Sequence, residues 1–131
     1  MKVSFDFDGT LGRKDVQKFA KELVAQGHEV WIVTSRCATE PALAKGWHWV
    51  ERQNNELYAV ADEVGIPRER IAFTEHVDKI EFLRGKEFVF HLDDDPDELM
   101  AILRDGEPCR PVNVDHMDWL LDCARLVTPD K

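Results

Sequence analysis

The chain has 131 residues and a formal net charge of −9, from 26 acidic and 17 basic side chains. Hydrophobic residues make up 44% and charged residues 33% of the sequence, a balance typical of a globular domain that excludes a long disordered chain. This length predicts one domain over residues 1–131. The acidic balance disfavours extended nucleic-acid binding, because an acidic surface repels the phosphate backbone.

The cysteines and the N-terminus indicate a cellular compartment. Cys37, Cys109 and Cys123 lie far apart and form no paired metal-ligand spacing, so we expect reduced thiols. The sequence opens directly into Met1–Phe5 without an apolar signal region, and no apolar run is long enough to span a bilayer. We therefore expect a cytoplasmic protein that does not bind membranes.

The first half of the chain alternates strand and helix patterns. Lys2–Phe7 is the first expected strand, and an Asp-Gly turn follows it. Apolar residues then recur with helical spacing in Asp15–Gln26. Glu29–Thr34 is apolar and typical of a buried parallel strand. Apolar spacing predicts one long helix over roughly Glu40–Val64.

The second half repeats this alternation. In chain order, the expected elements are a strand Arg70–Thr74, a helix Val77–Leu83, a strand Glu87–Leu92, a helix from Pro96 to about Arg104 capped by Asp95, a strand Pro111–Val114, and a helix capped by Asp115 that runs through Leu126. The whole pattern predicts an α/β fold. It is a three-layer α/β/α, Rossmann-like arrangement around a mainly parallel five-stranded sheet.

Polar residues gather just after the expected strands, where ligands bind in open parallel sheets. The first strand leads into Asp6-Phe7-Asp8-Gly9-Thr10, the second into Thr34-Ser35-Arg36, and the fourth into Asp93-Asp94-Asp95. Carboxylates held close together repel one another unless a cation neutralises them. Asp6, Asp8 and the pair Asp93-Asp94 therefore predict a hard oxygen cluster suited to Mg²⁺.

The same residues could carry out phosphoryl chemistry. A hydroxyl at Thr34 or Ser35 and the ammonium of Lys79 could hold phosphate oxygens. Asp6 could act as a carboxylate nucleophile, and Asp8 could protonate a leaving group and later activate water. Simpler roles compete with these: a helix cap for the hydroxyls, and a solvated surface position for the lysine.

These segments resemble the four motifs of the haloacid dehalogenase (HAD) superfamily. Asp6-Phe7-Asp8-Gly9-Thr10 is similar to the first motif, Thr34 to the second, Lys79 to the third and Asp93-Asp94 to the fourth. Their order along the chain also agrees with the expected order of strands. The resemblance covers nearly the whole chain and implies a HAD-like phosphatase fold.

The resemblance also implies a role for each matching residue. Asp6 would be the nucleophile and a Mg²⁺ ligand, and Asp8 the general acid/base that binds Mg²⁺ through its backbone carbonyl. Thr34 and Lys79 would bind the phosphoryl group. Asp94 would ligate the metal directly, and Asp93 would support the site without touching the metal. Asp8 marks the phosphatases and phosphotransferases of the superfamily, so carbon–halogen chemistry is not expected.

The spacing leaves no room for the cap domain that many superfamily members carry. A capless relative implies a site open to large substrates, or one that a neighbouring subunit closes, so an oligomer is left open. Thr34-Ser35-Arg36, followed by a Trp-containing helix, also resembles the 5′-nucleotidase and polynucleotide 3′-phosphatase branches. The substrate could accordingly be a nucleotide or a nucleic-acid end.

Two further groups have open interpretations. Arg36 could hold a second anionic group of the substrate or lie on the surface. Trp47 in Trp47-His48-Trp49 could stack on a base, although the pattern favours one Trp in the core and one partly exposed. His91 is expected to pack within its strand and not to act as a base.

Two alternatives to a phosphatase stay open. A phosphotransferase would use the same residues but deliver the phosphoryl group to an acceptor other than water. A binding or regulatory module could keep a HAD fold without turnover. The presence of Asp6, Asp8, Thr34, Lys79 and Asp94 together argues against the second alternative, because such a module has no physical need for all of them.

Overall fold

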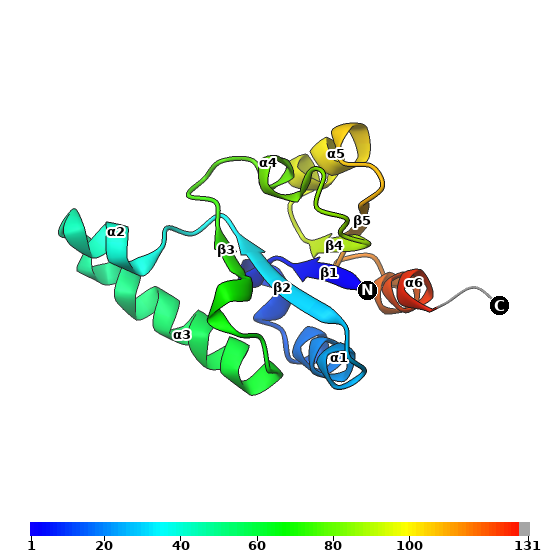
Figure 1. The fold of residues 1–131 in the computed structure, drawn as a ribbon, viewed down its shortest axis with the longest axis horizontal. Helices are drawn as coiled ribbons and strands as arrows, with labels where there is room; N and C mark the ends of the chain where they lie inside the picture. Colours follow the sequence, from blue (N-terminus) through cyan, green and yellow to red (C-terminus); the bar gives the residue numbers. More distant parts are fainter. Residues whose placement is uncertain (129–131) are drawn as a thin grey trace.

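A computed structural model describes residues 1–128, in which strands and helices alternate along the chain (Figure 1). The strands are β1 (Lys2–Phe5), β2 (Glu29–Thr34), β3 (Ile71–Phe73), β4 (Phe90–Asp93) and β5 (Arg110–Asn113). The helices are α1 (Lys14–Ala25), α2 (Thr39–Ala44), α3 (His48–Val64), α4 (Lys79–Leu83), α5 (Pro96–Asp105) and α6 (Trp119–Val127). Two short turns, η1 (Phe7–Leu11) and η2 (Arg68–Arg70), complete the described elements.

All five strands are parallel, in the order β3-β2-β1-β4-β5. The chain builds the sheet from β1 toward β3 and then returns to the other side of β1 with β4. Ser4 of β1 consequently lies opposite His91 of β4, although the two are far apart in sequence. Ligands bind in such sheets beyond the carboxyl ends of the strands, where the strand order reverses. Here that point lies between β1 and β4.

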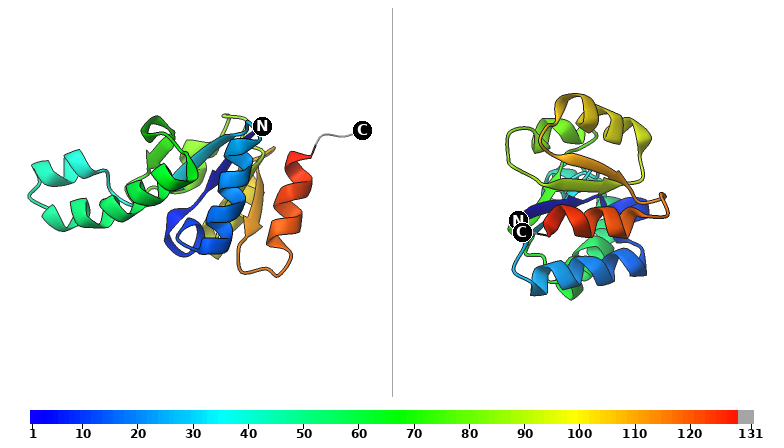
Figure 2. Two further views of the ribbon diagram at one scale, coloured as in Figure 1. Left: turned by 90° about the horizontal axis from the view of Figure 1, so that it is seen from below. Right: turned by 90° about the vertical axis from the view of Figure 1, so that its right-hand side faces the viewer.

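Helices cover both faces of the sheet, which confirms the expected three layers (Figure 2). On one face, α1, α3 and α6 pack against inward residues of the strands, among them Phe5, Ile32 and Phe90. On the other face, α4 and α5 pack around Val33 and Phe88. Adjacent strand residues point to opposite faces, so the strands are apolar on both sides, as in other doubly covered parallel sheets.

The segment expected to form one helix over Glu40–Val64 forms two, α2 and α3. Gly46 has φ 79°, a left-handed backbone that cannot continue a right-handed helix. The apolar spacing runs across this glycine, and that spacing made the two helices look like one. Helix α2 and the start of α3 extend away from the sheet beyond β2 and β3 (Figure 1).

Smaller boundary expectations are also corrected. β1 ends at Phe5 and not at Phe7, and β4 begins at Phe90 and not at Glu87, which has a left-handed φ of 64°. Asp115 does not cap the last helix: its N–H donates to Asn113 Oδ1 (2.8 Å), and α6 begins only at Trp119. By contrast, the expected cap of α5 is confirmed, since the Asp95 side chain accepts a hydrogen bond from Asp97 N–H (2.9 Å). Within residues 1–128, every helix is too short or too polar to cross a membrane.

Candidate active site

A wide turn, η1, carries the chain out of β1 and positions Asp6. The backbone N–H of Asp6 still donates to Leu92 O of β4 (2.9 Å), while its carbonyl accepts the N–H of Leu11 (3.0 Å). Gly9 within this turn has φ 75°, and a Cβ there would lie 2.2 Å from Asp94 Oδ2. The turn therefore needs glycine for two reasons, its backbone conformation and its close approach to a carboxylate.

Three carboxylates meet at the carboxyl ends of β1 and β4. Asp6, Asp93 and Asp94 each offer an oxygen atom, and these atoms lie within 4.8 Å of one another. Asp6 and Asp93 are buried, at 4% and 0% relative exposure. The tertiary structure thus brings together residues from the first and fourth predicted motifs, as the sequence led us to expect.

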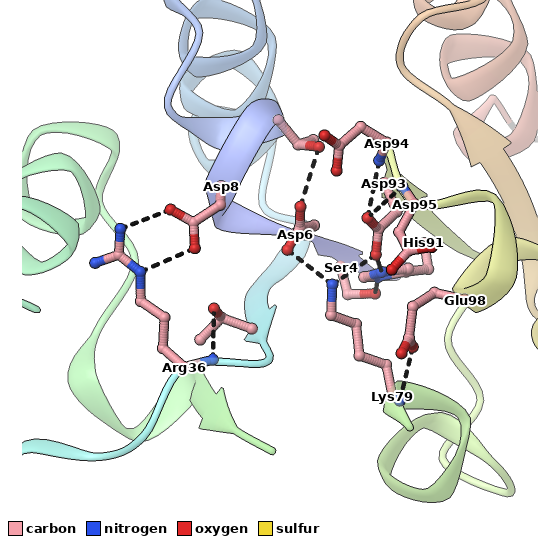
Figure 3. Close-up of polar contacts among 12 residues, drawn as sticks. Ser4, Asp6, Asp8, Arg36, Lys79, His91, Asp93, Asp94, Asp95 and Glu98 are labelled. Atoms are coloured by element: carbon pink, nitrogen blue, oxygen red, sulfur yellow. Dashed lines mark hydrogen bonds and ion pairs between the residues drawn. The ribbon is translucent and has the colours of Figure 1, made fainter. Parts of the chain in front are cut away.

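Lys79, at the start of α4, lies between two of these carboxylates (Figure 3). Its Nζ is 2.7 Å from Asp6 Oδ1 and 2.7 Å from Asp93 Oδ2, and the side chain is buried. Its backbone N–H donates to Glu98 Oε2 of α5 (2.8 Å), which ties α4 to α5. Among the nearby basic residues, Lys79 is therefore the one that enters the cluster; Arg84 and Lys86 lie on the surface.

Asp93 is further held by a buried histidine and serine. His91 Nε2 lies 2.7 Å from Asp93 Oδ2, and His91 Nδ1 lies 2.8 Å from Ser4 Oγ. The other oxygen of Asp93 accepts the N–H groups of Asp94 (2.8 Å) and Asp95 (3.1 Å). The Asp93 side chain thereby takes part in four hydrogen bonds, more than that of Asp6, which takes part in two.

No role was expected for Ser4, Glu98 or Thr10, and His91 was expected only to pack within its strand. His91 does lie fully buried in β4, but it also orients Asp93. A polar Ser4 and a polar His91, each alternating with apolar residues of its strand, are a signal that could have indicated this network. Thr10 belongs to the first motif, but no separate role was expected for it. Its Oγ1 donates to Asp6 Oδ2 at 3.4 Å.

The electrostatics of the cluster separate Asp6 from Asp93. Burial, together with the charge of Asp93, raises the pKa of Asp6 to about 8, although Lys79 acts in the opposite direction. Burial also acts to raise the pKa of Asp93, but the hydrogen bonds from His91 and Lys79, together with the charge of Lys79, outweigh it and hold the pKa well below its usual range. Burial lowers the pKa of His91, which favours the neutral ring.

One lysine does not balance this much negative charge. The pKa of Lys79 is raised, because the attraction of Asp6 and Asp93 exceeds the effect of burial, so Lys79 stays protonated. Burial and the charge of Asp93 raise the pKa of Asp94 as well. Burial is the larger cause of both shifts, and a cation bound to the carboxylate oxygens would oppose it by favouring the ionised forms.

Asp8 lies on the other side of the candidate site, in contact with Arg36 (Figure 3). Arg36 Nε and Nη2 donate to the two oxygens of Asp8, at 2.9 and 2.7 Å. Arg36 Nη1 donates to Gln53 O of α3 (2.6 Å), and the guanidinium lies over the Phe7 ring, 4.8 Å from its centroid. Arg36 thus connects the turn after β1 to α3. For Arg36 we expected either a contact with an anionic group of the substrate or a surface position. The contact with Asp8 was not expected.

The hydroxyl residues after β2 do not cap a helix. Thr34 is buried at the end of β2, and its Oγ1 accepts the N–H of Arg36 (3.3 Å). Ser35 follows it, but the next helix, α2, begins only at Thr39 with Ala38 as its N-cap. Both hydroxyls lie at the same strand-end edge as Asp6, the position from which they could meet a phosphate.

Neither tryptophan of the Trp47-His48-Trp49 cluster fills the core. Trp47 is 40% exposed and Trp49 is 52% exposed, so the expectation of one buried Trp is wrong. Their rings stack, with centroids 6.4 Å apart and planes inclined by 25°. Trp49, and not the expected Trp47, lines a cavity of about 290 Å³ that also touches Asp8 and Arg36.

The donor set fits Mg²⁺ in kind. Mg²⁺ prefers carboxylate, carbonyl and water oxygens, and it binds through one or two carboxylates in many phosphoryl-transfer enzymes. Asp6 and Asp94 supply such oxygens, and the three carboxylates, when ionised, carry more negative charge than Lys79 alone balances. The residues at the end of β1 and β4 would therefore accept the ion.

The chain was also compared with protein-family models and with curated protein sequences. No protein-family model matches the chain, and no curated protein sequence matches it.

Proposed function

We propose that this protein is a Mg²⁺-dependent phosphomonoester hydrolase of the HAD type that works through an aspartyl phosphate on Asp6. One observation carries the proposal: Asp6 is buried at the end of β1, bonded to Lys79 and close to Asp94, with Asp8 two residues further on. A fixed, desolvated carboxylate among cation-binding groups is what covalent phosphoryl chemistry needs.

The first step transfers the phosphoryl group to the protein. An Asp6 carboxylate oxygen attacks phosphorus, the bond from phosphorus to the alcohol oxygen breaks, and Asp8 gives its proton to that oxygen. Asp8 must exchange its Arg36 contacts for the leaving-group oxygen to do so. Lys79 and the Thr34 and Ser35 hydroxyls hold the phosphate oxygens in this proposal.

The second step hydrolyses the intermediate. Asp8 takes a proton from water, the water oxygen attacks phosphorus, and the bond from phosphorus to Asp6 breaks, which releases inorganic phosphate and restores both aspartates. Mg²⁺, when held by Asp6, Asp94 and the Asp8 carbonyl, would neutralise the charge that otherwise repels an anionic substrate. Asp93 would keep its four hydrogen bonds and orient Lys79.

The substrate in this proposal is a phosphomonoester, with a nucleotide or a nucleic-acid end as the candidate. The lack of a cap domain, expected from the sequence, also stays a prediction. Only Gly12 and Arg13 separate the turn η1 from α1, and between Thr34 and Lys79 the chain forms α2, α3, η2 and β3.

The test is phosphate release from p-nitrophenyl phosphate, nucleotides, sugar phosphates and a 3′-phosphorylated oligonucleotide, with Mg²⁺ and with a chelator. We expect metal-dependent release that falls at least about 10⁴-fold in Asp6→Asn, as for other nucleophile removals. Asp95→Asn is the matched control, since asparagine also caps helices and Asp95 has no role in the chemistry. Transfer to added alcohols in preference to water would identify a phosphotransferase. A folded protein that binds Mg²⁺ but releases no phosphate from any substrate would contradict the proposal and favour a binding module.

A further inference from the structure

A small cavity borders the candidate active site on the side of Asp8. It has a volume of about 290 Å³, and its lining includes Asp8, Ser35, Arg36, Trp49, Gln53 and His76. Four larger hollows, of about 720, 540, 750 and 500 Å³, lie elsewhere on the molecule. In residues 1–128, none of these four is lined by the carboxylates that follow β1 and β4, so the smaller one is the cavity next to the chemistry.

The position of Asp8 determines what can enter this cavity. If Asp8 protonates the leaving oxygen, the alcohol part of the substrate has to lie within hydrogen-bond reach of Asp8. Asp8 itself forms part of the cavity wall, together with Ser35 just after β2. The cavity is therefore continuous with the place that the leaving alcohol must occupy.

Trp49 gives this cavity a flat aromatic wall. Its ring stacks on Trp47, and Lys45 Nζ lies 4.8 Å from the centroid of the Trp47 ring. These contacts hold the indole of Trp49 while it remains 52% exposed. Two stacked tryptophans left exposed beside the candidate active site form a surface that a planar ring of a ligand would cover, because aromatic rings attract one another beyond the effect of area burial.

Polar groups around the cavity could fix the orientation of such a ring. A guanidinium has five N–H donors, and three hydrogen bonds of Arg36 run to Asp8 and to Gln53 O, so two donors remain. His76 lies on the same wall, and its backbone N–H donates to Ser35 O (2.9 Å), which fixes the loop after β3. A volume of about 290 Å³ equals roughly ten water-sized groups, which suits one ring system.

We propose that this cavity is the leaving-group subsite, that it selects phosphomonoesters whose alcohol part carries a planar ring, and that Trp49 determines this selectivity. The proposal rests on the proposed phosphatase function. Two sources share this chemistry, nucleoside monophosphates and simple aryl phosphates, and the substrates below distinguish them.

The kinetic test compares matched substrates with and without the ring. Adenosine 5′-monophosphate is compared with ribose 5-phosphate, and phenyl phosphate with butyl phosphate, by the ratio of their kcat/KM values. We expect wild-type protein to prefer the ring-bearing member, and Trp49→Ala to reduce that preference about tenfold, the size of one stacking contact on a base. Trp49→Phe should keep most of it. The pair with the larger preference identifies the source.

Trp47→Phe is the matched control, because a Phe ring can still stack on Trp49 and Trp47 does not line the cavity. It should keep most of the preference. An equal loss in Trp47→Phe and Trp49→Ala, or an unchanged ratio in Trp49→Ala, would overturn the inference while leaving the phosphatase proposal intact.

A second measurement does not depend on turnover. Adenosine and phenol are titrated into metal-free protein, and the indole N–H signals of Trp47 and Trp49, assigned with Trp→Phe variants, are followed by NMR. We expect the Trp49 signal to shift more than the Trp47 signal. No shift of Trp49 with either ligand would overturn the subsite. A shift without phosphate release from any substrate would instead count against the proposed phosphatase alone.

Discussion

The charged side chains on the two sides of the candidate active site differ in how far they are exposed to water. At the ends of β1 and β4, Asp6, Lys79 and Asp93 are nearly excluded from water, at 4%, 3% and 0% exposure. On the side of β2, Asp8 is 59% exposed at its side chain, and its partner Arg36 lies beside an open cavity. Buried charges interact strongly but cost much to leave unpaired, whereas exposed pairs contribute little. We therefore expect the first side to control stability and metal binding, and the second to control substrate choice.

Removal of the buried lysine should give the largest effect. Lys79→Met leaves Asp6 and Asp93 without their shared counter-charge, and loss of one member of a buried ion pair costs about 3–5 kcal/mol. Urea unfolding of metal-free protein measures this change. Lys86→Met is the control, since Lys86 is exposed, and it should change the free energy of unfolding by less than about 0.5 kcal/mol. A similar stability for both variants would show that Lys79 is not the counter-charge that stabilises the buried carboxylates.

The pH dependence of stability should reveal the raised pKa of Asp6. The folded protein binds this proton up to a pKa of about 8, whereas the unfolded chain releases it near the ordinary value of 3.8. Asp6 therefore lowers the free energy of unfolding as the pH rises between these values, by at most about 1.4 kcal/mol per pH unit for one proton. His91, whose pKa is lowered, adds a slope of the opposite sign as the pH rises through its unfolded value of 6.5.

The contribution of Asp6 is isolated by comparison with Asp6→Asn in metal-free protein, because His91 is present in both. We expect Asp6→Asn to be relatively more stable at pH 8 than at pH 5, measured by thermal unfolding across this range. Saturating Mg²⁺ should reduce the difference in slope, since a bound cation favours the carboxylate. Parallel curves for the two proteins would mean that the pKa of Asp6 is not raised in the folded protein.

Gly9→Ala should weaken metal binding. A Cβ at Gly9 would lie 2.2 Å from Asp94 Oδ2 and would force that carboxylate to move. We expect Mg²⁺ affinity to fall roughly 10–100-fold, the range seen when the support of a metal ligand is lost. Isothermal titration calorimetry measures it. Gly27→Ala is a matched control, because Gly27 also has a positive φ, 90°, but no atom lies within 4 Å of its Cβ position. Equal affinities in both variants would argue against Asp94 as a ligand.

Arg36→Met should have the smallest effect on stability and still reduce turnover. The Arg36–Asp8 pair is partly exposed, so its loss should cost less than about 1 kcal/mol. Asp8 would lose its connection through Arg36 to α3, and we expect kcat/KM to fall about tenfold. Arg13→Met removes a comparable arginine contact, to Asp15 (2.7 Å), at the start of α1. Turnover should be unchanged in that control; a fall equal to that of Arg36→Met would remove the special role of Arg36.

The polar residues expected from the sequence do gather at one edge of one sheet, and the reason is topological. Parallel strands all end at the same edge, so any residue that directly follows a strand must come there. That rule was enough to bring Asp6, Thr34 and Asp94 together. The contact of Arg36 with Asp8 could not be predicted in this way, since it depends on where α3 places Gln53 O.

The sequence by itself determined the alternation of strands and helices, the parallel sheet and the residues at the strand ends, because strand and helix periodicities and strand-end positions are local properties of the chain. Only the tertiary structure decided that Lys79 lies between Asp6 and Asp93, that Ser4 and His91 support Asp93, and that Trp49 lines the cavity. Each of these depends on a contact between segments far apart in the chain: the packing of α4 on α5, the register of β1 with β4, and the position of α3 beside Asp8 and Arg36. Such contacts depend on how whole helices and strands pack together, and a local sequence pattern cannot predict them.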